Sequence, residues 1–134
     1  MSGINPWLTI ITLLSLLFYV VTSAAVGHAR AKHKVAAPAM VGPPAFERAV
    51  RVQANTLEWL PIYLPSLWLF AAVVSAPVAV ALGAVWLVGR IIYMAAYLRA
   101  ADKRGLGFTI QFLAAMALVF GGLIGAVVKL ISGS

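Results

Sequence analysis

The sequence contains no cysteine and little negative charge, since three Asp and Glu residues stand against ten Lys and Arg. Without cysteine the chain can form no disulfide, no thiolate metal site and no cysteine nucleophile, so any thiol chemistry needs a thiol from another molecule. Two histidines and three acids also leave little for a metal site, and we expect none.

Charge of either sign is scarce, at 10% of the 134 residues, whereas 63% are hydrophobic. In soluble domains about a quarter of the residues are charged and about half are apolar. Residues 1–134 are therefore expected to form one membrane-embedded domain. The net charge of +7 does not indicate a nucleic-acid partner, because the basic residues lie between long uncharged runs.

Long uncharged runs predict four membrane-spanning helices, because a helix needs about 20 apolar residues to cross the hydrocarbon core. The predicted spans are residues 6–27, 45–74, 77–100 and 107–131. Ser75-Ala76-Pro77 indicates a tight turn between the second and third spans. Short links between the spans predict an all-α integral membrane fold, an antiparallel bundle of four transmembrane helices.

Basic residues flank only two of the three connectors, which predicts the orientation. Connectors one and three lie on the same side of a four-span chain, and the positive-inside bias makes that side cytoplasmic. Both termini are then expected on the opposite face. The basic residues beside these connectors are Arg30, Lys32, Lys34, Arg48 and Arg51, and then Arg99, Lys103 and Arg104.

Ionisable residues in or beside a membrane span are candidates for a functional site, because placing them there is costly. Arg51, Asn55 and Glu58 are separated by four and three residues, which puts them on one face of the second helix. An alternative is that Arg51 and Glu58 form a buried structural ion pair between helices.

A second set of polar residues lies on the third helix. Arg90, Tyr93 and Tyr97 share one face, and Arg104 joins them if the helix continues through Asp102. The alternative here is that the tyrosines are interfacial belt residues and that Arg104 is a cytoplasmic anchor.

Together the two sets indicate a zwitterionic ligand with excess negative charge, bound beside the lipid. Guanidinium groups pair with carboxylates, a carboxylate pairs with an ammonium, and amide and phenol groups serve peptide groups. Glutathione has that inventory. Other small peptides and anionic lipids fit it almost as well.

These residues resemble the MAPEG family, the membrane-associated proteins of eicosanoid and glutathione metabolism, and most of all its branch of microsomal glutathione transferases and leukotriene-C synthase. The pattern covers about residues 30–104. It consists of Gly42-Pro43-Pro44, Phe46-Glu47-Arg48, Arg51-Val52-Gln53-Ala54-Asn55, Glu58, Pro61, Arg90, Tyr93, Tyr97, Arg99 and Arg104.

The resemblance implies a homotrimer that binds glutathione between neighbouring protomers, as co-substrate and without a metal. By match to the family, Arg104 faces the sulfur, where a fixed cation favours the thiolate. The residues that the resemblance assigns to the rest of glutathione are Arg30, Arg51, Gln53, Asn55, Glu58, Tyr93 and Tyr97.

Three positions depart from the leukotriene-synthesising pattern, namely Ala31, Trp59 and Met116. The resemblance therefore favours a glutathione transferase of detoxification that conjugates hydrophobic electrophiles, with reduction of lipid hydroperoxides as an additional activity. One alternative is a non-catalytic protein of the same fold that binds a lipid or glutathione. A small multidrug transporter would need an acidic residue in its first span, and this chain has none there.

Overall fold

The computed structural model describes residues 3–133, which form four long helices joined by short connectors. The helices are α1 (Pro6–His33), α2 (Pro44–Val73), α3 (Ala76–Arg99) and α4 (Gly105–Ser132), with one turn of 3-10 helix, η1 (Ala101–Lys103), before α4. All four long helices are long and apolar enough to cross a membrane. The prediction of an all-α fold with four spans is confirmed.

Polar caps and prolines set where two of the helices begin. The Asn5 side chain accepts a hydrogen bond from the backbone N–H of Trp7 at 2.8 Å. The Ser75 hydroxyl accepts one from the N–H of Val78 at 3.3 Å, and Pro77 lies in the first turn of α3. These caps satisfy N–H groups that have no partner within the helix, and proline costs nothing there. The turn between α2 and α3 thus lies where the sequence predicts it.

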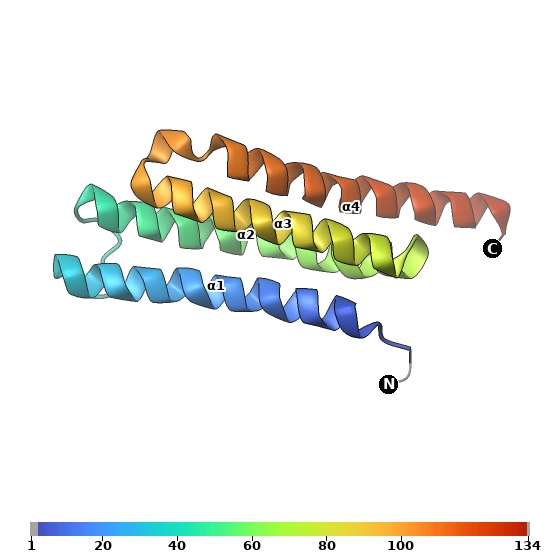
Figure 1. Cartoon of the computed structure of the whole chain (residues 1–134), viewed down its shortest axis with the longest axis horizontal. Coiled ribbons are helices and arrows are strands. Elements are labelled where there is room, and N and C mark those ends of the chain that lie inside the picture. Colours follow the sequence, from blue (N-terminus) through green and yellow to red (C-terminus); the bar gives the residue numbers. More distant parts are fainter. Residues whose placement is uncertain (1–2, 134) are drawn as a thin grey trace.

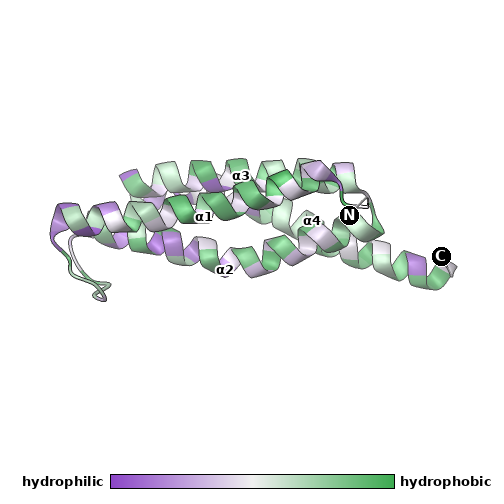
Figure 2. Cartoon of the chain, turned by 90° about the horizontal axis from the view of Figure 1, so that it is seen from below, coloured by the Kyte–Doolittle hydropathy of each residue, from purple (hydrophilic) through white to green (hydrophobic). Residues whose placement is uncertain are grey.

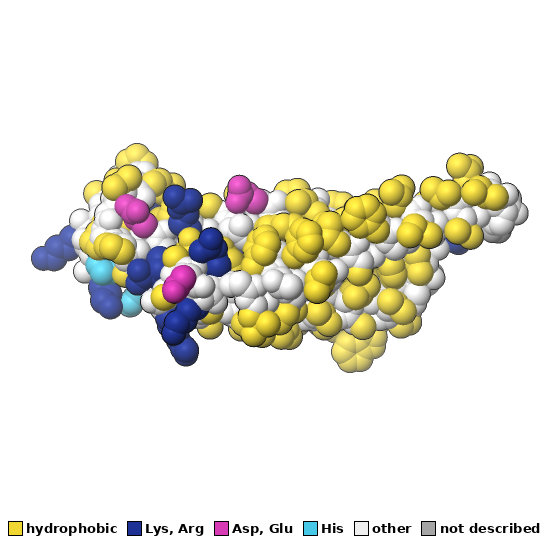
Figure 3. All heavy atoms as spheres, turned by 90° about the horizontal axis from the view of Figure 1, so that it is seen from above, with side chains coloured by type: hydrophobic (Ala, Val, Ile, Leu, Met, Phe, Trp, Pro, Cys, Tyr) yellow, Lys and Arg dark blue, Asp and Glu magenta, His cyan; other side chains and the backbone are white. Residues whose placement is uncertain are grey.

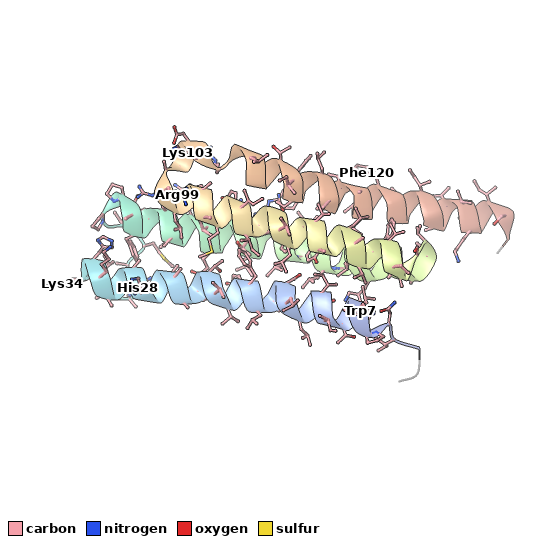
Figure 4. All side chains as sticks on the ribbon, in the orientation of Figure 1. Trp7, His28, Lys34, Arg99, Lys103 and Phe120 are labelled. Carbon is pink, nitrogen blue, oxygen red and sulfur yellow. The ribbon has the colours of Figure 1, made fainter. Side chains whose placement is uncertain are left out.

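The pair α2 and α3 lies between α1 and α4, which pack on opposite sides of it (Figure 1). The α1–α2 and α3–α4 connectors share one end of the bundle. The α2–α3 turn shares the other end with the beginning of α1 and the end of α4 (Figure 1). Charged side chains gather at the connector end on the face shown in Figure 3, and Figure 4 places Lys34, Arg99 and Lys103 there.

Most apolar side chains of the helices face outward rather than inward. Only 22–33% of the most apolar 18-residue stretch of each helix is buried. Trp7, Leu69 and Ile124 are each more than half exposed. Hydrophilic residues lie mainly toward the connector end, and hydrophobic ones cover the remaining length (Figure 2). An outer surface of this kind is stable in hydrocarbon, because the backbone polar groups are satisfied within the helices. The fold is that of an integral membrane protein.

A polar contact in the middle of the bundle joins three helices. Tyr63 of α2 stacks on Trp86 of α3, with ring centroids 3.8 Å apart and planes inclined by 4°. The Tyr63 hydroxyl lies 2.9 Å from the hydroxyl of Ser15 on α1. Both side chains of that hydrogen bond are fully buried. This contact holds α2 against α3 and so fixes how their polar ends face each other.

The backbones of α3 and α4 touch where glycine allows it. A Cβ added at Gly107 would collide with the backbone of Tyr93 and would lie 2.7 Å from the carbonyl oxygen of Gly89. A Cβ added at Gly89 would lie 2.6 Å from the backbone nitrogen of Gln111. Small residues permit this approach between membrane helices. The contact brings the first turn of α4 directly beside Tyr93.

Arg104 was expected to share the face of Tyr93 and Tyr97 only if the third helix continued through Asp102, and it does not. The helix ends at Arg99 and Ala100 is extended (φ −162°, ψ 133°), so Arg104 does not continue the face of Tyr93 and Tyr97. Arg104 instead precedes the first residue of α4, with φ −74° and ψ −13°. The helical spacing could not reveal this, because the chain reverses direction between the two tyrosines and Arg104.

The first helix also extends further than its predicted span. Its last helical residue is His33. The next residue, Lys34, caps the helix in a left-handed conformation with φ of 56°. The other three helices begin and end within two residues of the predicted spans. The thickness of the hydrocarbon core sets the length of the apolar run, but it does not set where a helix ends.

We predict that Gly107→Ala destabilises the protein, because the added methyl group would overpack the α3–α4 contact at a cost of about 1–3 kcal/mol. The measurement is the thermal unfolding midpoint of the detergent-solubilised protein, which should fall by about 5 °C or more. Gly27→Ala is the matched control, because a Cβ there has no neighbour within 4 Å. Equal midpoints for the two variants would contradict the contact.

Candidate functional site

A cavity of about 700 Å³ opens at the connector end of the bundle, between α2, α3 and the segment before α4. It brings together six of the eight residues that the sequence singled out. These are Arg51, Asn55, Glu58, Tyr93, Tyr97 and Arg104. The first set and three of the four residues of the second set therefore form one concave surface, while Arg90 of the second set is buried behind it.

One wall of the cavity comes from α2. Arg51, Asn55 and Glu58 follow one another along it at helical spacing, as predicted. In the single chain Arg51 and Glu58 are both exposed, so neither is part of a buried ion pair within that chain. Both charged groups remain free to meet a ligand.

The opposite wall comes from the end of α3 and the segment after it. The rings of Tyr93 and Tyr97 lie 5.4 Å apart, and the guanidinium carbon of Arg104 lies 5.8 Å from the ring centre of Tyr97. One Arg104 nitrogen donates a hydrogen bond of 2.6 Å to the carbonyl oxygen of Ala101. The arginine head is thereby held over the aromatic wall, and its other N–H groups can serve a ligand.

Arg30 and Gln53 do not line this cavity. The Gln53 amide donates a hydrogen bond of 2.8 Å to the hydroxyl of Ser23, between α1 and α2. Arg30 donates to the carbonyl oxygen of Ala39 at 2.7 Å and lies 5.2 Å from the ring centre of Phe46. Within a single chain these two residues are therefore separate from the other six.

Two charged residues of the cavity were not among the predicted site residues. Glu47 and Arg48 both line it, in the first turns of α2. The signal was present in the sequence, because Glu47 lies four residues before Arg51 and Arg48 lies three before it. Glu47 also accepts a hydrogen bond of 3.1 Å from the backbone N–H of Gly42, which ties the first connector to α2.

An aromatic cluster continues from the cavity along α2 and α4. Trp59 packs edge-on against Phe108 and Phe112, with ring centroids 5.7 and 5.8 Å apart. Phe108 also contacts Tyr93, at 6.2 Å between centroids. Trp59 is half-buried and Phe112 is exposed on the outer face of α4. The charged cavity and the lipid-facing surface therefore meet at this cluster.

The balance of charges indicates what the cavity can hold. Three arginines and two glutamates line it, so the lining carries net positive charge beside an aromatic edge. Among residues 3–133 no group of His, Asp and Glu could hold a metal ion. The fold and the cavity together define a class of protein, a four-helix membrane protein with a polar cavity of net positive lining at one end of the bundle.

Comparison with known proteins gives the family. The sequence model of the MAPEG family matches residues 8–124, which is most of the chain. The chain belongs to the MAPEG family, and the resemblance seen in the polar residues is confirmed. The region that matches includes the outer helices, where the polar pattern is absent.

The relatives fall in the branch that the polar residues indicate. Microsomal glutathione S-transferase 2 of Mus musculus is 37% identical over 111 residues, covering 83% of this chain and 76% of the relative. Leukotriene C4 synthase of Cavia porcellus is 37% identical over 97 residues, covering 72% of this chain and 65% of the relative. An uncharacterized protein of Synechocystis sp. is 49% identical over 118 residues, covering 88% and 86%.

Proposed function

We propose that this protein is an integral-membrane glutathione transferase that joins the glutathione thiolate to hydrophobic electrophiles. The observation that carries the proposal is the single cavity in which Arg51, Asn55, Glu58, Tyr93, Tyr97 and Arg104 meet. Relatives named as a glutathione transferase and as leukotriene C4 synthase support it.

The α2 wall suits the polar groups of glutathione. Arg51 can pair with a carboxylate through two parallel N–H groups, and Glu58 can pair with the ammonium group. The amide of Asn55 and the two tyrosine hydroxyls can bond to the peptide groups. A tripeptide fits the volume of about 700 Å³, which leaves room for part of a second substrate.

Arg104 is the catalytic residue of the proposal. A free thiol has a pKa of about 8.5, and only its thiolate is a good nucleophile. A fixed guanidinium beside the sulfur lowers the pKa of the thiol, and it does so without losing its own proton. The thiolate then attacks the electrophilic carbon of the second substrate and forms the C–S bond, while the displaced electron pair leaves with the leaving group or takes up a proton.

The second substrate is proposed to enter from the bilayer along the aromatic cluster of Trp59, Phe108 and Phe112. That cluster joins the lipid-facing surface of α4 to the cavity. A lipid hydroperoxide entering by the same route would place its O–O bond beside the thiolate. Attack of the thiolate on the outer oxygen forms an S–O bond, giving glutathione sulfenic acid, and breaks the O–O bond; the alkoxide that leaves takes up a proton and becomes the alcohol. The thiol of a second glutathione then attacks the sulfenic sulfur, which forms the disulfide and releases water.

A homotrimer would give Arg30 and Gln53 a role in binding, although neither residue lines the cavity of its own chain. In the proposed homotrimer glutathione binds between neighbouring protomers, as the family resemblance implies, so these two residues would reach the ligand from an adjacent copy. Arg30 lies in the last turn of α1, at the connector end, and Gln53 is bonded to Ser23 of the same helix. By the positive-inside bias, we propose that this end faces the cytoplasm.

We predict that Arg104→Ala lowers turnover with the model electrophile 1-chloro-2,4-dinitrobenzene far more at pH 6.5 than at pH 9. Without the guanidinium the pKa of the bound thiol rises toward about 8.5, so the thiolate fraction falls at low pH and recovers at high pH. The measurement is the pH profile of kcat, with a loss of about 100-fold expected at pH 6.5.

The matched control for that profile is Lys103→Ala, which removes a neighbouring exposed cation that does not line the cavity. Its profile should follow the wild type. A parallel fall at every pH in Arg104→Ala would instead mean that Arg104 supports binding or folding and does not activate the thiol.

We also predict that Glu58→Gln weakens glutathione binding by about 10- to 100-fold, because a charge-assisted hydrogen bond to the ammonium contributes about 1.5–3 kcal/mol. Calorimetry should show the loss. Glutathione that lacks its amino group supplies the control, since wild type and Glu58→Gln should bind it equally. A Glu58→Gln variant that still prefers the amino form would contradict this assignment.

The non-catalytic alternative gives a different set of results. In a binding protein of the same fold, both the wild type and Glu58→Gln would show saturable glutathione binding. Neither would catalyse conjugation at any pH. Turnover above the uncatalysed rate in the wild type excludes it.

A further inference from the structure

A buried cation lies behind the cavity without forming part of its lining. Arg90 is the first residue of the polar face of α3 that continues with Tyr93 and Tyr97, is 0% exposed and lies within a helix able to span the membrane. Ionisable residues at such positions are costly and mark functional sites by default. Neither the thiolate chemistry nor the proposed glutathione contacts account for it.

The hydrogen-bond partners of Arg90 are both neutral and both lie on α2. One terminal nitrogen donates to the side-chain oxygen of Asn55 at 2.8 Å, and the other donates to the hydroxyl of Thr56 at 2.6 Å. Among residues 3–133 its Nε has no hydrogen-bond partner. The guanidinium carbon lies 4.4 Å from the ring centre of Tyr93. If Arg90 served only to join the two helices, a carboxylate partner would stabilise its buried charge better than these neutral groups do.

The contact with Asn55 determines what that residue offers to a ligand. Arginine has only donors, so the Asn55 atom that it contacts must be the carbonyl oxygen of the amide. The NH₂ group of Asn55 is then the part left for the cavity, which Asn55 lines. Without Arg90 the amide could turn over and present an acceptor instead.

The Thr56 contact fixes the guanidinium itself. Thr56 is fully buried, and its hydroxyl donates to the carbonyl oxygen of Val52 at 2.7 Å, which leaves its lone pairs for Arg90. Two bonds to adjacent residues of α2 hold the planar guanidinium in one orientation. Thr56 does not line the cavity.

We infer that Arg90 is a positioning residue of the glutathione site, which holds Asn55 as a hydrogen-bond donor to a carbonyl or carboxylate oxygen of the ligand. This inference rests on the proposed function. Arg90 does not contact the ligand itself, and its hydrogen bond to Thr56 keeps the guanidinium in the orientation that holds Asn55.

The test is a double-mutant cycle read out by calorimetry with glutathione, on the wild type, Arg90→Met, Asn55→Ala and the double variant. Arg90→Met should weaken glutathione binding by about tenfold in the wild type and by less than about threefold in the Asn55→Ala background. The kcat at saturating glutathione should stay within about threefold of wild type, because Arg104 is unaffected.

A merely structural role, or a general attraction of the buried charge for anions, gives a different pattern. Arg90→Met would then weaken binding by the same factor in both backgrounds, or would not weaken it at all, and either result overturns the inference. Wild type that binds no glutathione would overturn the proposed function and this inference together. Wild-type binding with an unaffected Arg90→Met overturns the inference alone.

A second variant keeps the test decisive if Arg90→Met does not fold. Thr56→Val removes one acceptor of the guanidinium and leaves the cavity lining intact. It should weaken glutathione binding about threefold in the wild type and leave the Asn55→Ala variant unchanged. Unchanged glutathione affinity in Thr56→Val in the otherwise wild-type protein would overturn the inference.

Discussion

The close contact between the backbones of α3 and α4 at Gly89 and Gly107 is the constraint on which the site depends. It brings the first turn of α4 against Tyr93, so the short segment that carries Arg104 must fold back over the end of α3. A side chain at Gly107 would separate the helices and move Arg104 away from Tyr97. The chemistry proposed for the cavity therefore rests on two positions that bear no functional group.

The second constraint is the membrane itself. The outward faces of the helices are apolar along most of their length, and the charged side chains gather at one end. Arg51, Glu58 and Arg104 can then form a polar cavity only at that end, where it opens beside both water and lipid. This placement suits a reaction between a water-soluble thiol and a lipid-soluble electrophile, because each substrate reaches the cavity from its own phase.

Much of this arrangement could be predicted from the sequence, because a lipid environment restricts which residues a membrane-spanning helix can carry. Long uncharged runs predicted the four helices, and helical spacing correctly placed Arg51, Asn55 and Glu58 on one face. The meeting of that face with Tyr93 and Tyr97 was inferred from the ligand that their combined side chains suit and from the resemblance, since no spacing relates residues on different helices. The end of the third helix near residue 100 and the connector that carries Arg104 were predicted correctly, but no spacing could show that Arg104 would come to lie beside Tyr97. Arg90 stood out by its charge, but its bonds to Asn55 and Thr56 depend on how α2 and α3 pack.

The central claim is that this cavity converts a bound thiol into a thiolate. The most direct measurement is a rapid-mixing titration of the detergent-purified protein with glutathione at pH 7, followed by the ultraviolet absorbance of the thiolate. We expect a signal that saturates with glutathione concentration and is absent with S-methylglutathione, which has no thiol proton to lose. Saturable binding of glutathione without any thiolate absorbance would contradict it.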